Sequence, residues 1–599
     1  MRFIKYGLLV ILLIAAAHTA PVSAQQVQDD GACDADLAKL LVQQVVAESR
    51  TVAETDKRIK ILIRSAEFLW RSDQQSARDY LAEAYKVASD NFKEKGRETK
   101  DRAGTISPVS DHRFEVIGAI AAKDPQWARR LMDELLKEAE KAASDRSSSD
   151  RLSEAREIMS IALANIESNS ELSRYLLRRL MAKPLDSHWL YALCQIADKD
   201  RQFADQLYAE LLRNYANETP RRFLFLSSYP FGGGRMLGID KYMFGYSSDS
   251  PGLFANRELQ AQFILAFFRR IVAYTADPAN HGRPPEQYYR SEPLYMVSAL
   301  RDLEPIIVER FPSLLQQFAE VRAQAHAMLN DEMRKQLSDD TERTDQLAAS
   351  FEDRLAEVEQ ADKDGRLSDS MIANLVTWGT TDKTEEQFKK ILPWLGKIED
   401  RSLREAVENY YWFLRTKLAI KEERFDDAEN FAAKVPTIEH RAVLMFDIAK
   451  GTLKNISIAA EARQILGDVG RLARQADDSV AKARVLLGLV SVYDGLDHVI
   501  AMEELSDAVK VINKLDGPDL LSGAVYQQIK GKAFMFYAMY SVPEYDLEST
   551  FNLISKNDFS LSLSNARALN DKYLRTLAVL AVAQNCIDKP KPRRRSAGH

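Results

Sequence analysis

KDPQWARRLMDELLK, residues 123–137, returns as KDRQFADQLYAELLR, residues 199–213, and this repeat decides the fold. The two segments match at ten of fifteen positions when Lys and Arg, and Trp and Phe, are counted as equivalent. Apolar residues recur in both at helical spacing, with charged residues between them. Asp124 supplies an N-cap and Pro125 suits the first helical turn. Because an apolar, alanine-bearing helix precedes each segment, the repeating unit is a helical hairpin.

Weaker copies of this hairpin extend through the chain. In the C-terminal half, residues 441–449 and 482–490 repeat at an offset of 41, and residues 575–583 form a third copy of that helix. A single hairpin cannot bury its apolar face, so hairpins stack on their neighbours. We find no convincing run of alternating β-branched residues. We therefore predict an all-α protein, an irregular helical-hairpin array of the α-solenoid type. The N-terminal units start near residues 71, 123, 168 and 199.

The segment KEERFDDAENFAAKV, residues 421–435, resembles the second helix of tetratricopeptide-type repeats in its small residues and alanines. The resemblance implies an α-solenoid architecture. The period of about 34 residues and the full signature of that family are not kept in this sequence. We therefore carry over the architecture and no binding residues.

The first 24 residues have the pattern of a Sec-type signal peptide. Arg2 and Lys5 form a basic start, and residues 7–17 form an apolar run shorter than the roughly 20 residues that span a bilayer. Small residues lead up to Ala24, so we expect cleavage after it and export to the periplasm or beyond. The alternative is an uncleaved anchor helix. No later segment predicts a membrane span.

The net charge limits the partners that we expect, and the number of cysteines limits the disulfides that can form. The formal net charge is −6, which argues against a nucleic-acid partner because such a partner favours a basic field. The three cysteines, Cys33, Cys194 and Cys586, can form at most one disulfide. Whether one forms, and between which residues, stays open. Cys194 lies in an apolar helix pattern, which indicates a buried small residue.

The insertion SSYPFGGGRMLGIDKYMFGY, residues 227–246, surrounds three consecutive glycines with aromatic residues. Its glycine spacing fits neither a P-loop nor a dinucleotide-binding turn. A loop of this length is usually functional or a packed excursion. Its aromatic residues either cover the hydrophobic end of a hairpin stack or line a groove for a peptide or a sugar. The candidate binding residues are Tyr229, Phe231, Arg235, Asp240, Tyr242, Phe244, Tyr246 and Asp249.

These patterns divide the chain into successive segments. The charged stretch 330–366 predicts either a projecting helical arm or a solvated connector. The expected segments are a signal peptide (1–24), a flexible linker (25–33), an N-terminal hairpin array (34–228), the aromatic and glycine-rich insertion (229–256), a middle helical region with the charged arm (257–366), a C-terminal hairpin array (367–588) and a disordered basic tail (589–599).

No motif for enzymatic or metal chemistry is complete in this sequence. A G-x-S-x-G elbow is absent and the histidines are scattered. Residues 360–371 follow part of the EF-hand spacing, but Gln360 and Met371 replace the first aspartate and the final glutamate. We expect a capped polar turn there, and we expect no catalytic residues, no cofactor and no metal.

We therefore expect an exported, non-enzymatic binding scaffold whose partner is a protein or a component of the cell envelope. The alternative is a helical-toroid carbohydrate-active enzyme, a hydrolase or a lyase, with aromatic sugar platforms and two carboxylates. In that alternative, one pocket gathers Tyr229, Tyr242, Tyr246, Asp240 and Asp249 with Tyr288 of a second aromatic loop, residues 281–290.

Overall fold

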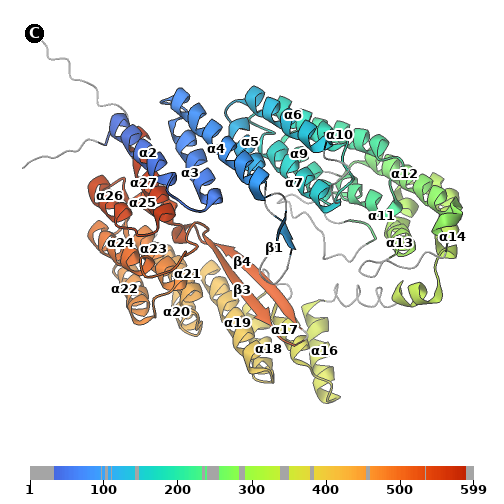
Figure 1. Cartoon of the computed structure of the whole chain (residues 1–599). Coiled ribbons are helices and arrows are strands. Elements are labelled where there is room, and N and C mark those ends of the chain that lie inside the picture. The colour runs from blue at the N-terminus through green and yellow to red at the C-terminus, as the bar shows by residue number, and fades with distance from the viewer. Residues whose placement is uncertain are drawn as a thin grey trace, which may run out of the picture. The chain divides into compact units, whose positions relative to one another are not determined.

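Helices make up nearly all the regular structure of the computed structural model (Figure 1). Contacts divide the chain into two compact units. Unit 1 comprises residues 1–51, 423–526 and 539–599, and unit 2 comprises residues 52–422 and 527–538. The structure describes residues 33–95, 98–100, 106–108, 111–141, 148–232, 236–238, 255–281, 291–337, 350–377, 383–453, 459–532 and 534–588. The expected signal peptide, nearly all of the linker and the basic tail lie outside these residues.

Unit 2 is a succession of helices with a small antiparallel pair of strands. Its α-helices are α3 (Thr55–Leu69), α4 (Gln74–Lys95), α5 (His112–Ala121), α6 (Pro125–Lys141), α7 (Ser148–Ala164), α8 (Ser170–Leu180), α9 (Trp189–Lys199), α10 (Arg201–Asn214), α11 (Pro220–Phe223), α12 (Arg257–Ala276), α13 (Glu292–Arg310), α14 (Leu315–Ala327), α16 (Phe351–Lys363), α17 (Asp369–Thr377), α18 (Glu385–Leu395) and α19 (Arg401–Lys421). Short 3₁₀ turns are η2 (Leu224–Leu226), η3 (Tyr229–Phe231), η4 (Pro278–Asn280) and η5 (Pro312–Leu314), and strand β1 (Glu98–Lys100) pairs with β2 (Ile106–Pro108).

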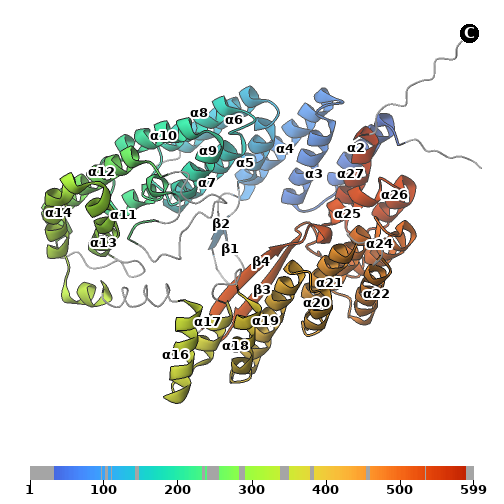
Figure 2. The same ribbon diagram turned by 180° about the vertical axis from the view of Figure 1, so that it is seen from behind.

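The predicted hairpins are confirmed in the first half of unit 2. Helices α3, α5, α7 and α9 contact one another in turn, and each packs on the helix that follows it in the chain. The two repeated segments are α6 and α10, which are the second helices of the hairpins α5–α6 and α9–α10, with the hairpin α7–α8 between them (Figure 2). Their caps repeat as well, because Asp124 and Asp200 each accept a backbone hydrogen bond at 3.0 Å, from Trp127 and Phe203.

Arginine–aromatic pairs connect the second helices of these hairpins. In each pair a guanidinium lies over an aromatic ring of the next layer, which combines apolar contact with attraction to the ring face. Arg78 and Arg174 also donate to the cap residues Asp124 and Asp200, at 2.5 and 2.8 Å. The pairs, with distances to the ring centre, are Arg78–Trp127 (5.7 Å), Arg129–Tyr175 (4.1 Å), Arg174–Phe203 (4.5 Å) and Arg201–Tyr229 (6.0 Å).

The polar segment with partial EF-hand spacing forms the turn between α16 and α17. Gly365 has a φ of 66°, a left-handed conformation that suits glycine at the end of a helix. Asp364 pairs with Arg366 at 2.7 Å, and Asp362 pairs with Lys397 at 2.6 Å. The carboxylates of this turn therefore face cationic side chains of the chain itself.

Unit 1 brings together helices from both ends of the sequence. Helices α21, α23, α25, α27 and α2 contact one another in this order, so the first helix of the described chain follows the last one in the row. Within this row α21 and α23 carry the repeat predicted at 441–449 and 482–490. The elements are α2 (Ala35–Ser49), α20 (Phe425–Ala432), α21 (Ile438–Thr452), α22 (Ala459–Gln475), α23 (Val480–Tyr493), α24 (His498–Ile512), η7 (Pro543–Tyr545), α25 (Leu547–Ile554), α26 (Phe559–Arg567) and α27 (Lys572–Asp588).

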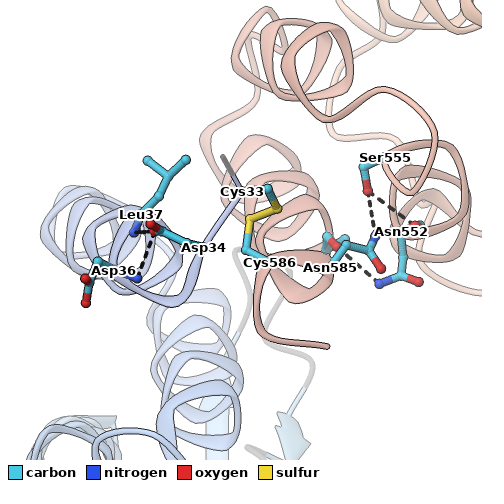
Figure 3. The surroundings of a disulfide bond; sticks show 9 residues. Cys33, Asp34, Asp36, Leu37, Asn552, Ser555, Asn585 and Cys586 are labelled. Atoms are coloured by element: carbon cyan, nitrogen blue, oxygen red, sulfur yellow. Dashed lines mark hydrogen bonds between the residues drawn. A yellow bond between two sulfur atoms is a disulfide. The ribbon is translucent and has the colours of Figure 1, made fainter. Parts of the chain in front are cut away.

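A disulfide joins the first and the last helical segment of unit 1 among the described residues. Cys33 is bonded to Cys586 across a sequence separation of 553 residues (Figure 3). Asp34, the next residue, caps α2 by accepting from the backbone of Leu37 at 2.9 Å. On the other side of the bond, Asn585 donates to the carbonyl of Asn552 at 2.6 Å. The sequence left this pairing open, and Cys194 remains a buried free thiol.

The interface between α2 and α27 is apolar at its centre and polar at its edge. Arg575 of α27 donates to Glu48 of α2 at 3.0 Å, and Lys572 donates to Thr51 at 3.1 Å. The expected N-terminal array began at residue 34, whereas the compact units assign α2 to the same unit as α27. The buried apolar residues of α2 are Ala38, Leu41, Val42, Val45 and Val46.

A second strand pair, which the sequence analysis missed, is the hairpin of β3 (Ala524–Lys530) and β4 (Met535–Ser541). Its tip, residues 527–538, belongs to unit 2, where Phe536 packs on Tyr410 of α19 with ring centres 5.2 Å apart. The other face of β4 exposes more than half of each of Met535, Tyr537 and Met539. The exposed positions of β4 are therefore as apolar as the covered ones. For this reason the sequence lacks the alternation of apolar and polar residues that would indicate a strand.

Candidate functional site

Tyr229, the first candidate of the aromatic insertion, is a packing residue. Its side chain is fully buried, its ring lies 5.5 Å from that of Tyr208, and its hydroxyl donates to Asp205 at 2.6 Å. With Arg201 it continues the arginine–aromatic series of the hairpins. Phe231 is half-buried and meets the ring of Phe263 edge-on at 5.8 Å. Of the two expected roles, these contacts are those of a cover over the hairpin stack.

Gly238 of this insertion is fixed by close packing. Gly238 has a φ of 77°, and a Cβ there would lie 2.9 Å from the carbonyl oxygen of Tyr295. Its N–H donates to Asp302 at 3.0 Å. The preceding Met236 and Leu237 are buried. Glycine is needed here because the backbone passes directly against α13.

The other candidates from the sequence lie outside the described residues. The structure therefore gives no position for Arg235, Asp240, Tyr242, Phe244, Tyr246, Asp249 or Tyr288.

A groove on unit 1 is the candidate site that the structure offers instead. It lies among α20, α21 and α22, which are neighbours in both views (Figures 1 and 2). Its volume is about 300 Å³, at the lower end of the range for ligand pockets. The residues that line it are Glu429, Ala433, Arg441, Met445, Asp468, Arg471, Leu472 and Gln475.

The position of α20 beside α21 follows from small residues. Ala428 and Ala432 are buried, and the ring of Phe425 occupies the space that a side chain at Gly451 would need. These alanines belong to the segment that resembles a tetratricopeptide-type helix. Close packing on one side of α20 leaves Glu429, on another side, facing the groove.

Arg441 fixes the turn between α20 and α21. Its Nε donates to the carbonyl oxygen of Val435 at 2.8 Å and its Nη2 donates to that of Ala433 at 2.6 Å. A cation at the C-terminal end of a helix also interacts favourably with the helix dipole. The guanidinium is therefore committed to the backbone, and it forms one wall of the groove.

Negative charge predominates around Glu429. Partial burial raises the pKa of its carboxyl, and the charges of Glu461, Asp426 and Asp468 raise this pKa further. Arg471, the other cation in the lining, pairs with Asp468. Within the part of the chain that the structure describes, Glu429 forms no ion pair. The groove thus combines an uncompensated carboxylate with the apolar side chains of Met445 and Leu472.

Sequence reasoning did not find this groove. Each lining residue is ordinary for an exposed helix face, and the eight positions spread over 47 residues, from 429 to 475. The available signal was the tetratricopeptide-type segment itself, since hairpin arrays of this kind use the faces of their helices for binding.

Two features are absent from the described residues, a membrane span and a metal-binding cluster. None of the helices placed by the structure has both the length and the apolar character of a membrane span. In the same residues no three His, Cys, Asp or Glu side chains are grouped so as to hold a metal ion.

Comparisons with known proteins identify no family for this chain. No protein-family model matches the chain, and no curated protein matches it. Among solved structures, one match is a "circular tandem repeat protein with novel repeat topology and enhanced subunit contact surfaces". It is 13% identical in sequence, and the match covers 92% of this chain and 97% of that chain with a TM-score of 0.12. A score this low carries no argument about function.

Proposed function

We propose that the protein is an exported helical-repeat scaffold that binds another protein or a component of the cell envelope through the groove of unit 1. The observation that carries this proposal is the groove itself, a concave site built from three helices of the array. Arrays of stacked hairpins expose such surfaces because each unit buries one face against its neighbours and leaves another to solvent.

Two features support export. The first 24 residues have the pattern of a cleaved leader. The bond between Cys33 and Cys586 belongs to an oxidising compartment, because the reducing cytosol of most cells keeps thiols free. These features are independent of each other, since one concerns a targeting segment and the other concerns a pairing in the folded chain.

The binding role is tested by filling the groove. Ala433 is an exposed residue at the C-terminal end of α20 and lines the groove. We expect Ala433→Trp to release envelope partners that the unaltered mature chain retains in a crosslinking pull-down from envelope extracts. A tryptophan side chain occupies much of a groove of this size.

A matched control is Ala122→Trp, at an exposed alanine that ends α5 in the same way. Both variants place a large side chain at a helix end, and only one of them enters the groove. Circular dichroism establishes that both fold. If partners stay bound to Ala433→Trp, or leave both variants equally, the groove is not the binding site.

A further inference from the structure

The lining of the groove points to the chemistry of its occupant. Glu429 is half-buried and forms no ion pair within the described chain, and three further carboxylates, Asp426, Glu461 and Asp468, lie close enough to act on it. The cations nearby are engaged, Arg471 by Asp468 and Arg441 by backbone carbonyls. A cationic group of the ligand would therefore meet an acceptor with no competing donor.

The apolar part of the lining adds a second requirement. Met445 and Leu472 are half-buried in the groove wall and offer carbon and sulfur surface to a ligand. Lysine and arginine side chains carry an apolar stem that ends in a charge, and they bind along apolar surfaces with the charged head at a polar end. An inorganic cation would use the carboxylate and leave the apolar wall uncovered.

On the basis of the proposed function, we propose that the groove binds the lysine or arginine side chain of a basic polypeptide segment from a partner protein. The cationic head meets the carboxylate of Glu429, and the alkyl stem lies against Met445 and Leu472. Charge complementarity favours this occupant at Glu429, since this carboxylate forms no ion pair among the described residues and the charges that act on it are those of Glu461, Asp426 and Asp468.

The test uses the mature chain and a fluorescein-labelled peptide in which lysine alternates with alanine. A second peptide carries norleucine in place of lysine, which keeps the stem and removes the charge. Fluorescence anisotropy at low and at physiological salt measures both affinities. We expect the lysine peptide to bind more tightly than the norleucine peptide. We expect Glu429→Gln to weaken the lysine peptide about tenfold, as for the loss of a charge-assisted hydrogen bond.

Two further variants separate the groove from the general charge of the protein. Glu503→Gln removes the same charge from an exposed position of α24 in the same unit and is expected to leave the affinity unchanged. Arg471→Gln frees the carboxylate of Asp468 and is expected to tighten the lysine peptide about threefold. Equal weakening by Glu429→Gln and Glu503→Gln, or equal binding of the two peptides, would overturn the inference.

Other occupants give different results. Tighter peptide binding by a chain that ends at Asp588 would identify the basic tail of the chain itself as the occupant and overturn the assignment to a partner. Binding of calcium alone, lost in Glu429→Gln, would identify a metal site and overturn it as well. If Ala433→Trp releases envelope partners while Glu429→Gln leaves the lysine peptide bound, the proposed function stands and the cationic ligand does not.

Discussion

Gly488 shows how tightly the row of helices in unit 1 is packed. It lies in the middle of α23, and a Cβ built there would stand 2.9 Å from Cζ of Phe446 and 3.0 Å from Cε1 of Tyr545. Both of these aromatic side chains are buried. No backbone strain requires glycine at this position, so the requirement comes from the contact between layers alone.

We expect Gly488→Ala to lower the free energy of unfolding by about 1–3 kcal/mol, because the added methyl group overpacks a filled core. Gly467→Ala is the matched control, since Gly467 lies in α22 with no atom within 4 Å of the added Cβ. Alanine there is expected to stabilise the helix by up to about 1 kcal/mol. Urea unfolding followed by far-UV circular dichroism measures both, and two changes of the same sign would contradict the packing argument.

Single residues were predictable from the sequence where their role is local. Asp124 caps its helix as its position predicts, because a cap depends on residues three places apart, and Asp200 caps α10 at the equivalent place of the repeat. Tyr229 and Glu429 depend on partners in other helices. The sequence placed Tyr229 among candidate binding residues and the structure buries it, whereas Glu429 received no attention and lines the groove.

Among the elements, α2 depends most on distant parts of the chain. It packs on α27, is bonded to it through Cys33 and Cys586, and receives hydrogen bonds from Lys572 and Arg575. Each of the other helices in the row has at least one neighbour close in sequence. The disulfide therefore keeps an element in place whose sequence-local contacts are few.

We expect Cys33→Ala to accelerate hydrogen exchange of the α2 amides, with a loss of about 2–4 kcal/mol in the stability of the docked helix. The disulfide limits the conformations that α2 can adopt when it is detached from α27. Its removal therefore favours the detached state. Hydrogen exchange with mass spectrometry resolves α2 from the rest of the chain. Cys194→Ala removes a cysteine that forms no disulfide and should leave α2 unchanged; unchanged exchange in Cys33→Ala as well would refute the role given to the bond.

The strands β3 and β4 could not be predicted from the hydrophobic pattern of the sequence. Helices could be recognised because their periodicity extends over many residues. In β4 the burial of the side chains alternates along the strand, but their polarity does not. Its exposed positions hold Met535, Tyr537 and Met539, so the binary pattern disappears. These residues are extended because β4 pairs with β3, and the contact of Phe536 with Tyr410 of α19 covers one face of the strand.

For the molecule as a whole, all-α architecture was predictable because it needs only local periodicity. The grouping of the two chain ends in unit 1 was not predictable, since no local pattern links residues separated by 553 positions. Expected segment boundaries followed the order of the sequence, and the compact units do not follow that order.

The proposed export makes a prediction for the whole chain. All three cysteines lie in the described residues, and the structure leaves Cys194 as the free thiol. We expect the secreted protein, denatured without reductant, to titrate one thiol and, after reduction, three. A version that lacks residues 1–24 and stays in the cytosol should titrate three in both cases, because that compartment is reducing. Three free thiols in the secreted protein would argue against the oxidising location.

The pairing of α2 with α27 means that α2 is synthesised long before the helix on which it packs. Ribosomes add about 5–20 residues per second, so roughly half a minute to two minutes separate Cys33 from Cys586 during synthesis. Throughout that interval the apolar face of α2 lacks the helix that covers it in the folded protein. This face includes Leu41, Val42, Val45 and Val46. The first helix of the described residues therefore stays without its packing partner until α27, the last one, has been synthesised.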